Sequence, residues 1–389
     1  KRMTILDYVY ASAQKFPDKP AIIHQGEEIT YSRLYPMMKE CRPLPIPLLG
    51  EGWDKTFCLH TTGTTGQAKD VLVSQQAVIA NSENLIKAQG FSSDTVFVLA
   101  GALDHLGCWS KIFPVLMCGG TLIVLDGLKD MDAFLSAFDN PSSHLATFLV
   151  PAAIRMLLRF NAGRLARYAD RIEFLETGAA AISQADMQQL CAILPNTRLY
   201  NTYASTETGI LCTYNFNDGE CIPGCVGRPM HHSRVFITPE GQIACQGPML
   251  MSGYRGDEAS TCSVLREGTF YTADNGRIVE HGRLHILGRR DDVINVGGYK
   301  VAPTDVENAA LTFPSVADCI CVPVEHPITG KALKLLVVPA EGAEYSPKPL
   351  ALFLKSCLQP YQVPLFYQQV ERIERTPNGK LNRRFYAGK

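Results

Sequence analysis

Residues 61–69 read Thr61-Thr62-Gly63-Thr64-Thr65-Gly66-Gln67-Ala68-Lys69 and contain no large apolar side chain. Glycines let backbone N–H groups approach a ligand closely, hydroxyls donate hydrogen bonds and the ammonium supplies positive charge. The stretch therefore indicates a phosphate-binding loop, although the order of the common P-loop, G-x-x-x-x-G-K-[ST], is absent. A flexible surface turn is the alternative, because turns often have this composition.

Three further segments, far apart in the chain, carry polar and charged groups that suit the same ligand. They are YASTE at 203–207; YTAD at 271–274 with GRRDD at 288–292 and GGYK at 297–300; and RTPNGK at 375–380. In this order, and together with the Thr/Gly loop, they resemble the adenylate-forming superfamily. That superfamily contains acyl- and aryl-CoA synthetases, adenylation domains of peptide synthetases and firefly-type luciferases.

The resemblance extends from about Thr61 to Lys380 and is nearest to the AMP-dependent acyl-CoA synthetases and ligases. One region departs from the family pattern. Only residues 35–60 separate the segment TYSRL at 30–34, which resembles the family's T-Y-x-x-L, from Thr61. The family usually has a much longer stretch there. Short members of the family exist among the succinylbenzoyl-CoA synthetases, and similarity to these enzymes is one hypothesis for this chain.

The composition is that of an ordinary globular protein. The 389 residues are 46% hydrophobic and 19% charged, with a net charge of −1, and they suffice for two or three domains. The near-zero charge gives no case for a nucleic acid or an anionic membrane as partner. Apolar runs are too short to cross a membrane, and Lys1-Arg2-Met3 begins without the apolar core of a signal peptide. We expect a cytoplasmic protein.

Thirteen cysteines are scattered along the chain without a C-x-x-C pair. Most lie inside apolar segments, so we expect buried, reduced thiols. The alternative is a metal site that includes Cys221 and Cys225, although they have no partner pair at zinc-finger spacing.

Short apolar strands alternate with helical segments over the first two thirds of the chain, after an initial helix, strand pair and second helix at residues 4–39. The strands are expected at 57–60, 95–100, 121–125, 145–150, 174–177 and 198–200. This alternation predicts an α/β fold whose large N-terminal domain has parallel αβαβα-type sheets, covered by helices on both faces. Short strands and turns at 227–286 predict a small antiparallel or barrel-like region.

The last hundred residues have a different pattern, with helices expected at 303–311 and 348–358 and strands at 317–324 and 333–339. They predict a small α+β domain. We therefore divide the chain into an N-terminal adenylation domain, 1–287, and a C-terminal lid domain, 288–389. The resemblance implies that this lid is mobile and that Asp291 lies at the hinge.

The resemblance implies a nucleotide site drawn from all four segments. Tyr203 would pack against adenine, Asp274 would accept hydrogen bonds from the ribose hydroxyls, and Arg289 would bind ribose or phosphate. The full set of expected ATP/AMP-binding residues is Thr61, Thr62, Gly63, Thr64, Thr65, Gly66, Lys69, Gly178, Ala179, Tyr203, Thr206, Asp274, Arg289 and Lys380.

Three residues are expected to act in catalysis. A carboxylate that attacks the α-phosphate of ATP is anionic like its target, so the protein must screen charge and hold both groups in line. By resemblance, Thr206 contacts the α-phosphate, Glu207 holds Mg²⁺ and Lys380 brings a positive charge to the α-phosphate.

Each of these residues also has a simpler interpretation. Glu207 could be a solvated carboxylate at a helix start. Asp274 could cap the turn sequence Asp274-Asn275-Gly276. Lys380 could be a surface lysine near the end of the chain. The functional interpretation is preferred because the segments occur together and in order.

The resemblance also implies a pocket for the acid and a path for the thiol. The acid pocket would include His105, Trp109, Ala180 and Gly209. An aryl or medium acyl acid fits the space that small alanines leave. Gly297 and Gly298, which lack side chains, would admit the pantetheine arm of the acceptor.

Several positions depart from the family motifs. The loop has Ala68 where proline is usual and Asp70 where glycine is usual. Ala204 and Ala273 replace glycines, and Lys300 stands where many members have arginine. An acidic residue beside Lys69 could weaken its hold on phosphate.

The leading hypothesis is an AMP-forming acid–CoA ligase that uses ATP, Mg²⁺ and CoA on a small carboxylic acid. A second hypothesis is a ligase that loads an acyl or aminoacyl group onto the pantetheine of an acyl carrier protein. No carrier domain follows Lys389, so that partner would be a separate protein. A third is a nucleotide-binding remnant without turnover. No oligomeric state is specified.

Overall fold

The structure is a computed structural model that describes residues 3–46, 56–61, 69–128, 130–376 and 380–386. Seven residues of the predicted phosphate loop, 62–68, lie outside this range, and they include the expected ATP-binding residues Thr62, Gly63, Thr64, Thr65 and Gly66. Among the described helices, none combines the length and apolar character that crossing a membrane requires.

Parallel strands form the centre of the large domain. In spatial order they are β1 (Pro20–His24), β6 (Thr121–Val124), β5 (Val96–Leu99), β7 (Leu145–Phe148), β8 (Ile172–Thr177) and β9 (Arg198–Ser205). Every residue of β5, β6 and β7 is buried, as expected when helices cover both faces of a sheet. The predicted parallel α/β sheet is confirmed, except that the expected strand at 57–60 pairs antiparallel in a separate sheet.

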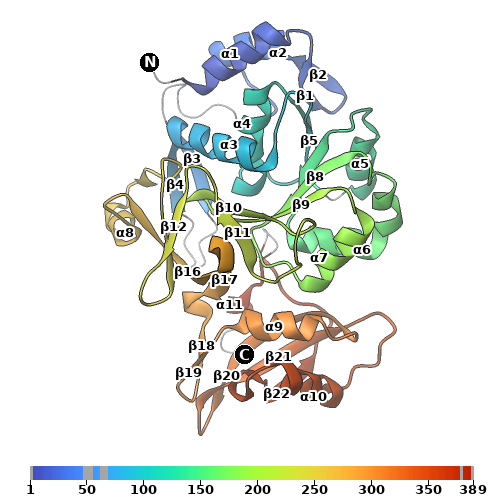
Figure 1. The fold of residues 1–389 in the computed structure, drawn as a ribbon, viewed down its shortest axis with the longest axis vertical. Coiled ribbons are helices and arrows are strands. Elements are labelled where there is room, and N and C mark those ends of the chain that lie inside the picture. The colour runs from blue at the N-terminus through green and yellow to red at the C-terminus, as the bar shows by residue number, and fades with distance from the viewer. Residues whose placement is uncertain (1–2, 47–55, 62–68, 129, 377–379, 387–389) are drawn as a thin grey trace.

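Two hydrophobic cores, one on each face, hold helices against this sheet (Figure 1). Strand β5 shows the division, because Phe97 and Leu99 belong to one core and Val96 and Val98 to the other. The first core takes side chains from α1 (Ile5–Lys15), α2 (Tyr31–Lys39), α3 (Gln75–Gln89) and α4 (Leu106–Cys118). The second takes them from α5 (Met131–Ser136), η1 (Ala137–Asp139), α6 (Pro151–Ala166) and α7 (Gln184–Ile193).

The predicted antiparallel region is also present, and it extends the same sheet. Beyond β9 the order is β10 (Gly209–Asn215), β11 (Cys225–Pro229), β17 (Arg283–Arg289), β16 (Thr269–Val279), β13 (Gln242–Gln246) and β12 (Arg234–Ile237). The other edge ends at β2 (Glu27–Thr30), and β15 (Leu265–Arg266) pairs with β16. A hairpin of β3 (Thr56–Thr61) and β4 (Lys69–Ser74), with β14 (Gly253–Tyr254), forms a separate three-stranded sheet; α8 (Glu258–Val264) and η2 (Glu280–Gly282) complete the domain.

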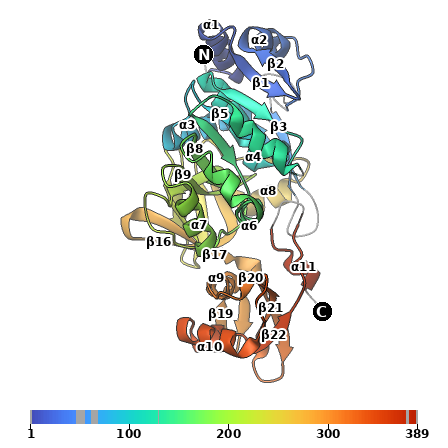
Figure 2. The ribbon, with the colours of Figure 1, turned by 90° about the vertical axis from the view of Figure 1, so that its right-hand side faces the viewer.

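A small C-terminal domain with its own core lies below the large one in Figures 1 and 2. Its elements are β18 (Ile294–Val296), β19 (Tyr299–Val301), α9 (Pro303–Leu311), β20 (Val316–His326), β21 (Gly330–Pro339), α10 (Pro347–Cys357), η4 (Pro360–Gln362), β22 (Phe366–Gln369) and α11 (Arg383–Tyr386). The predicted α+β composition is confirmed. The short helix η3 (Arg290–Asp292) connects β17 to β18. The domain boundary after residue 287 and the mobility of the lid stay predictions.

Candidate active site

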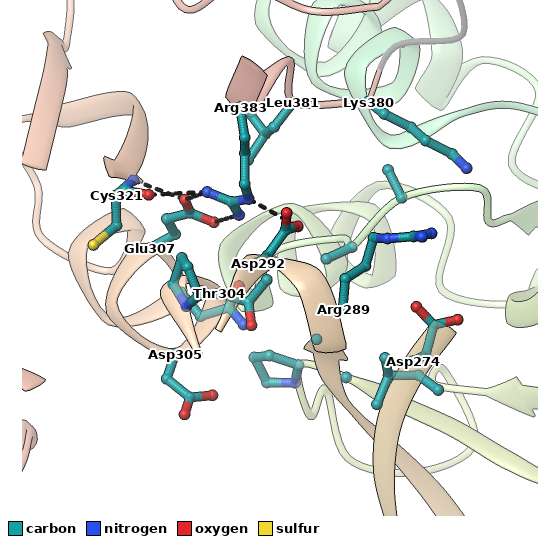
Figure 3. A pocket seen from close by; sticks show the side chains of 18 of the residues that line it. Asp274, Arg289, Asp292, Thr304, Asp305, Glu307, Cys321, Lys380, Leu381 and Arg383 are labelled. Carbon is teal, nitrogen blue, oxygen red and sulfur yellow. Dashed lines mark hydrogen bonds and ion pairs between the residues drawn. The ribbon is translucent and has the colours of Figure 1, made fainter. Parts of the chain in front are cut away.

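A cavity of about 1080 Å³ lies where the two domains meet. Its lining includes six residues that the sequence assigned to the nucleotide or acid site: Ala179, Ala180, Tyr203, Asp274, Arg289 and Lys380. Figure 3 shows the charged ends of Asp274, Arg289 and Lys380 gathered on one side of this cavity. Residues separated by about two hundred positions are thus brought together.

Asp274 accepts a hydrogen bond from a tyrosine on another strand of the same sheet. The hydroxyl of Tyr203, on β9, donates to Oδ2 of Asp274 at 2.7 Å. Burial and the nearby carboxylate raise the pKa of Tyr203 well above its ordinary value. The phenol therefore stays protonated and keeps Asp274 as a hydrogen-bond acceptor facing the cavity.

Asp274 and Arg289 are cross-strand neighbours, since their Cα positions pair between β16 and β17. The two side chains present opposite charges to the cavity from adjacent strands. The simpler interpretation, in which Asp274 caps a turn, is wrong, because the residue lies inside β16 and the strand continues to Val279. A carboxylate beside a guanidinium suits a ligand that carries both hydroxyls and phosphate.

Lys380 enters the cavity from the C-terminal segment. Its loop is closed by two hydrogen bonds with Thr376, from Thr376 N to Lys380 O at 2.8 Å and from Lys380 N to Thr376 Oγ1 at 3.2 Å. Desolvation within the cavity, and then the positive charge of Arg289, lower the pKa of Lys380, while Asp274 and Glu207 act in the opposite direction. The ammonium therefore lies within the field of charged groups from the large domain.

Arg383, which the sequence analysis did not single out, fixes the segment that carries Lys380. Its guanidinium donates to both carboxylate oxygens of Glu307, at 2.6 and 2.8 Å, and to Asp292 at 3.2 Å (Figure 3). Glu307 is 4% exposed, so this two-point ion pair is largely shielded from water. An arginine three positions after Lys380 could not be distinguished from other surface arginines by sequence alone.

Thr206 and Glu207 lie in the turn between β9 and β10, so Glu207 does not start a helix as the simpler interpretation proposed. The hydroxyl of Tyr254 donates to Glu207 Oε1 at 3.0 Å, and the ammonium of Lys69 lies 4.3 Å from the centre of the Tyr254 ring. Tyr254 thus links the end of the phosphate loop to the predicted magnesium ligand.

The described ends of the phosphate loop are the two strands of a hairpin. Thr61 and Lys69 are paired Cα positions of β3 and β4, and Thr61 Oγ1 lies 3.3 Å from both the backbone N and the backbone O of Lys69. The two residues at the ends of the loop therefore face each other across the hairpin and are in hydrogen-bonding distance.

Gly178 and Ala179 follow β8, and Ala179 lines the cavity. A Cβ on Gly178 would lie 2.8 Å from Thr202 Oγ1 and 3.0 Å from its carbonyl, so only glycine fits there. Ala179 has φ +67°, an unusual conformation for a residue with a side chain. Backbone strain of this kind is frequent where the chain turns around a ligand.

The predicted acid-pocket residues divide into two groups. Ala180 lines the cavity. His105 does not line it: this residue is the N-cap of α4, where its Nδ1 accepts from Gly107 N, and desolvation and then the charge of Lys380 lower its pKa.

Trp109 and Gly209 do not line the cavity. Trp109 is 3% exposed and packs edge-on against Phe57 and Phe113, with ring centres 5.3 and 4.8 Å apart, because it faces the first core. Gly209 has φ +65° and packs against Asn81 and Met249. Neither contact could be read from the sequence, since both depend on how distant elements meet.

The predicted thiol-path glycines form the tip of the β18–β19 hairpin, outside the cavity lining. Gly297 and Gly298 both have positive φ, +56° and +94°, as a two-residue hairpin turn requires. Asp291 lies in η3 and lines the cavity, with its carboxylate 4.0 Å from Arg289. The roles of these three residues stay predictions.

Three further ion pairs were not found from the sequence. Lys111, on α4, is fully buried and donates to Glu176 of β8 at 2.8 Å. Arg155, on α6, binds Asp186 at 3.0 Å and reaches Asp318 of the small domain at 3.1 Å. The lysine within the apolar segment 106–118 was a sequence signal for the pair of Lys111 and Glu176. The pair of Arg155 and Asp318 crosses the two domains, and the sequence contained no signal for it.

The alternative metal site at Cys221 and Cys225 is not supported. In the part of the chain that the structure describes, neither cysteine belongs to a group of three close candidate ligands. Cys225 is buried in β11, and the sulfur of Cys221 lies 3.8 Å from that of Cys191.

Comparison with known proteins identifies the family of this chain. Residues 46–255 match the AMP-binding enzyme family and residues 305–380 match the AMP-binding enzyme C-terminal domain. A feruloyl-CoA synthase from an Amycolatopsis species is 28% identical over 341 residues, which are 84% of this chain and 68% of that protein.

Two solved structures are also similar. ATP-bound MatB from Rhodopseudomonas palustris has a TM-score of 0.79 and 26% identity, over 87% of this chain and 69% of that one. The o-succinylbenzoate CoA synthetase MenE from Bacillus subtilis has a TM-score of 0.83 over 98% of both chains, and at 18% identity this likeness concerns the fold alone. Because the family match covers more than half of the residues, the chain belongs to the AMP-binding enzymes, that is, to the adenylate-forming superfamily.

Proposed function

We propose that this chain is an AMP-forming acid–CoA ligase. It would activate a carboxylic acid with ATP, release pyrophosphate and then pass the acyl group to the thiol of CoA. One observation carries the proposal: Lys380, from the C-terminal segment, shares a cavity with Asp274 and Arg289 on the paired strands β16 and β17. Membership in the AMP-binding enzymes supports a nucleotide as the ligand of this cavity.

In the first half-reaction, a carboxylate oxygen attacks the α-phosphorus of ATP. The bond from that phosphorus to the bridging oxygen breaks, and pyrophosphate leaves with the electron pair. Both reactants are anionic, so the ammonium of Lys380 lowers the barrier by offsetting the negative charge that gathers at the α-phosphate. Asp274, held by Tyr203, would orient the ribose and keep the reacting groups in line.

In the second half-reaction, the thiol sulfur attacks the acyl carbon of the adenylate. AMP leaves with the electron pair of the acyl–oxygen bond, and the thiol proton is released. No further activation by ATP is needed, because the mixed anhydride already contains a good leaving group. Gly297 and Gly298 would face the thiol only after the small domain turns.

The surroundings of Glu207 fit a magnesium ion that accompanies ATP. Magnesium is usually held by one or two carboxylates together with substrate phosphates and water. Glu207 offers one carboxylate, positioned by the Tyr254 hydroxyl and close enough to influence the pKa of Lys380. Bound there with ATP, the ion would neutralise phosphate charge.

An aryl or medium-chain acid is the proposed substrate class. The wall after β8 consists of three alanines, 179–181, and Ala152 contributes to the lining from α6. Small side chains leave room for a ring or a short chain. The similarity to a feruloyl-CoA synthase supports the same class.

A pyrophosphate-release assay with ATP, Mg²⁺ and a panel of aryl, short-chain, medium-chain and amino acids tests the proposal. We expect release with at least one aryl or medium-chain acid and a thioester when CoA is added. A thioester formed only with a pantetheinylated carrier protein would instead support the carrier-loading ligase. No release with any acid, although ATP binds, would support the non-catalytic alternative.

A further inference from the structure

The outward face of the β3–β4 hairpin carries three metal-ligating side chains. Along β3 the side chains alternate, with Phe57 and Leu59 buried and Cys58 and His60 on the opposite face. Asp70, on β4, is the Cα partner of His60. The pleat of the two strands therefore places a thiol, an imidazole and a carboxylate on one face.

The three side chains are close enough to bind one ion. His60 Nδ1 lies 2.6 Å from Asp70 Oδ1, and one ligand atom from each residue, including Cys58 Sγ, lies within 4.8 Å of the others. Zinc binds sulfur at about 2.3 Å and nitrogen or oxygen at about 2.0–2.2 Å in a tetrahedron, so its ligand atoms stand roughly 3–4 Å apart. Small side-chain rotations bring this group to that spacing.

We propose that Cys58, His60 and Asp70 bind a borderline divalent transition metal, with Zn²⁺ as the reference ion. Sulfur, imidazole nitrogen and carboxylate oxygen together select zinc or a similar ion over Mg²⁺ and Ca²⁺, which prefer oxygen ligands alone. On binding, the thiol loses its proton to solvent and the thiolate becomes the third ligand. Three protein ligands leave a fourth position for water.

A simple ion pair explains this group less well. Exposed His–Asp pairs are worth little, and His60 and Asp70 are 65% and 39% exposed. His24 and Asp126 form a comparable exposed pair with nitrogen and oxygen 4.0 Å apart, but they have no third ligand close by in the described chain. In the described ranges, Cys58, His60 and Asp70 are the one group of three that comes together in this way.

The position of the site suggests what the metal does. His60 and Asp70 form the cross-strand pair next to that of Thr61 and Lys69, where the phosphate loop begins and ends. A metal there would cross-link β3 to β4 at the base of that loop. It would also account for Asp70, which replaces a glycine that is usual in the family. The proposal does not depend on the proposed reaction, because its tests measure metal binding alone.

Titration of the purified, reduced chain with Co²⁺ tests the site. Cobalt replaces zinc and gives thiolate charge-transfer and tetrahedral ligand-field absorption. We expect one saturable set of bands that Zn²⁺ displaces. The charge-transfer band should be lost in Cys58→Ser, and binding should weaken at least about tenfold in His60→Ala and Asp70→Asn.

Two matched variants control for the other cysteines and histidines. Cys262→Ser removes an exposed thiol on α8, and His24→Ala removes the histidine of the comparable exposed pair. Both should bind cobalt like the unmodified protein. Circular dichroism of all variants checks that each is folded.

Alkylation of Cys58, followed by mass spectrometry of its peptide, gives an independent readout. Zn²⁺ should slow labelling of Cys58 at least about tenfold in the unmodified protein and not in His60→Ala, while labelling of Cys262 stays the same. Absence of cobalt bands, bands that persist in Cys58→Ser, or equal labelling with and without Zn²⁺ would each overturn the proposal. Failure of the chain to activate any carboxylic acid would not bear on the metal-binding proposal.

Discussion

At the scale of single residues, Lys380 shows how surroundings give a side chain a role. It follows Asn378-Gly379, a pair of residues that occurs in many surface turns. In the structure its ammonium instead lies in the field of Arg289, Asp274 and Glu207. A cation placed beside these groups is suited to a phosphate that gains negative charge during a reaction.

Replacing Lys380 by alanine should separate the two half-reactions. Adenylate formation should fall by about 10²–10³-fold, because a positioned charge on the reacting phosphate is lost. Thioester formation from supplied acyl-adenylate should stay within about twofold. Single-turnover pyrophosphate release and thioester formation measure the two rates. Lys355→Ala, an exposed lysine on α10, is the control, and an equal loss in both half-reactions would contradict the role.

The lowered pKa of Lys380 predicts that the pH profile of the first half-reaction has an alkaline limb, along which the rate falls. The protonated form is the active one, so the rate should fall as pH rises through a pKa below the ordinary value of 10.5. In Lys380→Arg the limb should move to higher pH, since a guanidinium keeps its proton there. Pyrophosphate bursts measured across the alkaline range give the midpoint, and an unchanged limb in Lys380→Arg would assign it to another group.

At the scale of elements, the buried pair of Lys111 and Glu176 joins helix α4 to strand β8. Both side chains are almost fully buried, and Thr202 donates a further hydrogen bond to Glu176 Oε1 at 2.9 Å. Strand β8 leads through Gly178 to Ala179, which lines the cavity. The pair therefore fixes the end of β8 relative to α4, which begins near His105.

Substitutions at this pair should be strongly non-additive. Lys111→Met leaves a buried carboxylate without its partner and should lower the free energy of unfolding by about 3–5 kcal/mol. Glu176→Gln should also destabilise, whereas the double variant should recover most of the loss, because no unpaired charge remains. Urea unfolding of the four proteins gives the coupling energy. Arg372→Ala, in an exposed pair with Glu374, should change stability by less than about 0.5 kcal/mol. Additive effects at Lys111 and Glu176 would contradict this account.

At the scale of the whole molecule, ion pairs across the two domains hold the observed arrangement. Asp318 of the small domain accepts from Arg155 of α6 and from Arg375, and the carboxylate is 20% exposed. Arg159 and Glu341 form a second, more exposed pair across the domains. Because Arg375 lies on the segment that leads to Lys380, these contacts favour the orientation that keeps Lys380 in the cavity.

Breaking the inner pair should therefore shift the balance between domain orientations. Arg155→Ala should slow adenylate formation about 5–30-fold, which corresponds to about 1–2 kcal/mol, and should leave thioester formation from acyl-adenylate unchanged or faster. Asp318→Asn should act in the same direction. Single-turnover rates of both half-reactions are the measurement.

Arg164→Ala is the matched control for that shift, since Arg164 lies on the same helix but pairs with Asp132 inside the large domain. Both half-reaction rates should stay at the level of the unmodified chain. If Arg155→Ala slows both half-reactions equally, the arginine acts on the substrate or on stability, and the domain contact does not set the orientation.

Much of the architecture followed from local sequence patterns. Buried strands such as 96–99 and 121–124 are short apolar runs, and helix α9 begins at a proline and spans the predicted residues. The order of the nucleotide motifs identified the superfamily. These features depend on residues that are close in the chain, so sequence was enough to determine them.

Tertiary structure alone decided which side chains meet. Trp109 lies in the core and not at the cavity, Arg383 binds Glu307, and Cys58 joins His60 and Asp70. Each contact depends on strand register or on the packing of distant elements, and a shift of one residue in a strand would reverse which face a side chain occupies. Periodicity along the chain carries no information about such pairings, which is why the sequence predicted the fold and the charged cavity residues Asp274, Arg289 and Lys380 but not the ion pairs that position the elements around them.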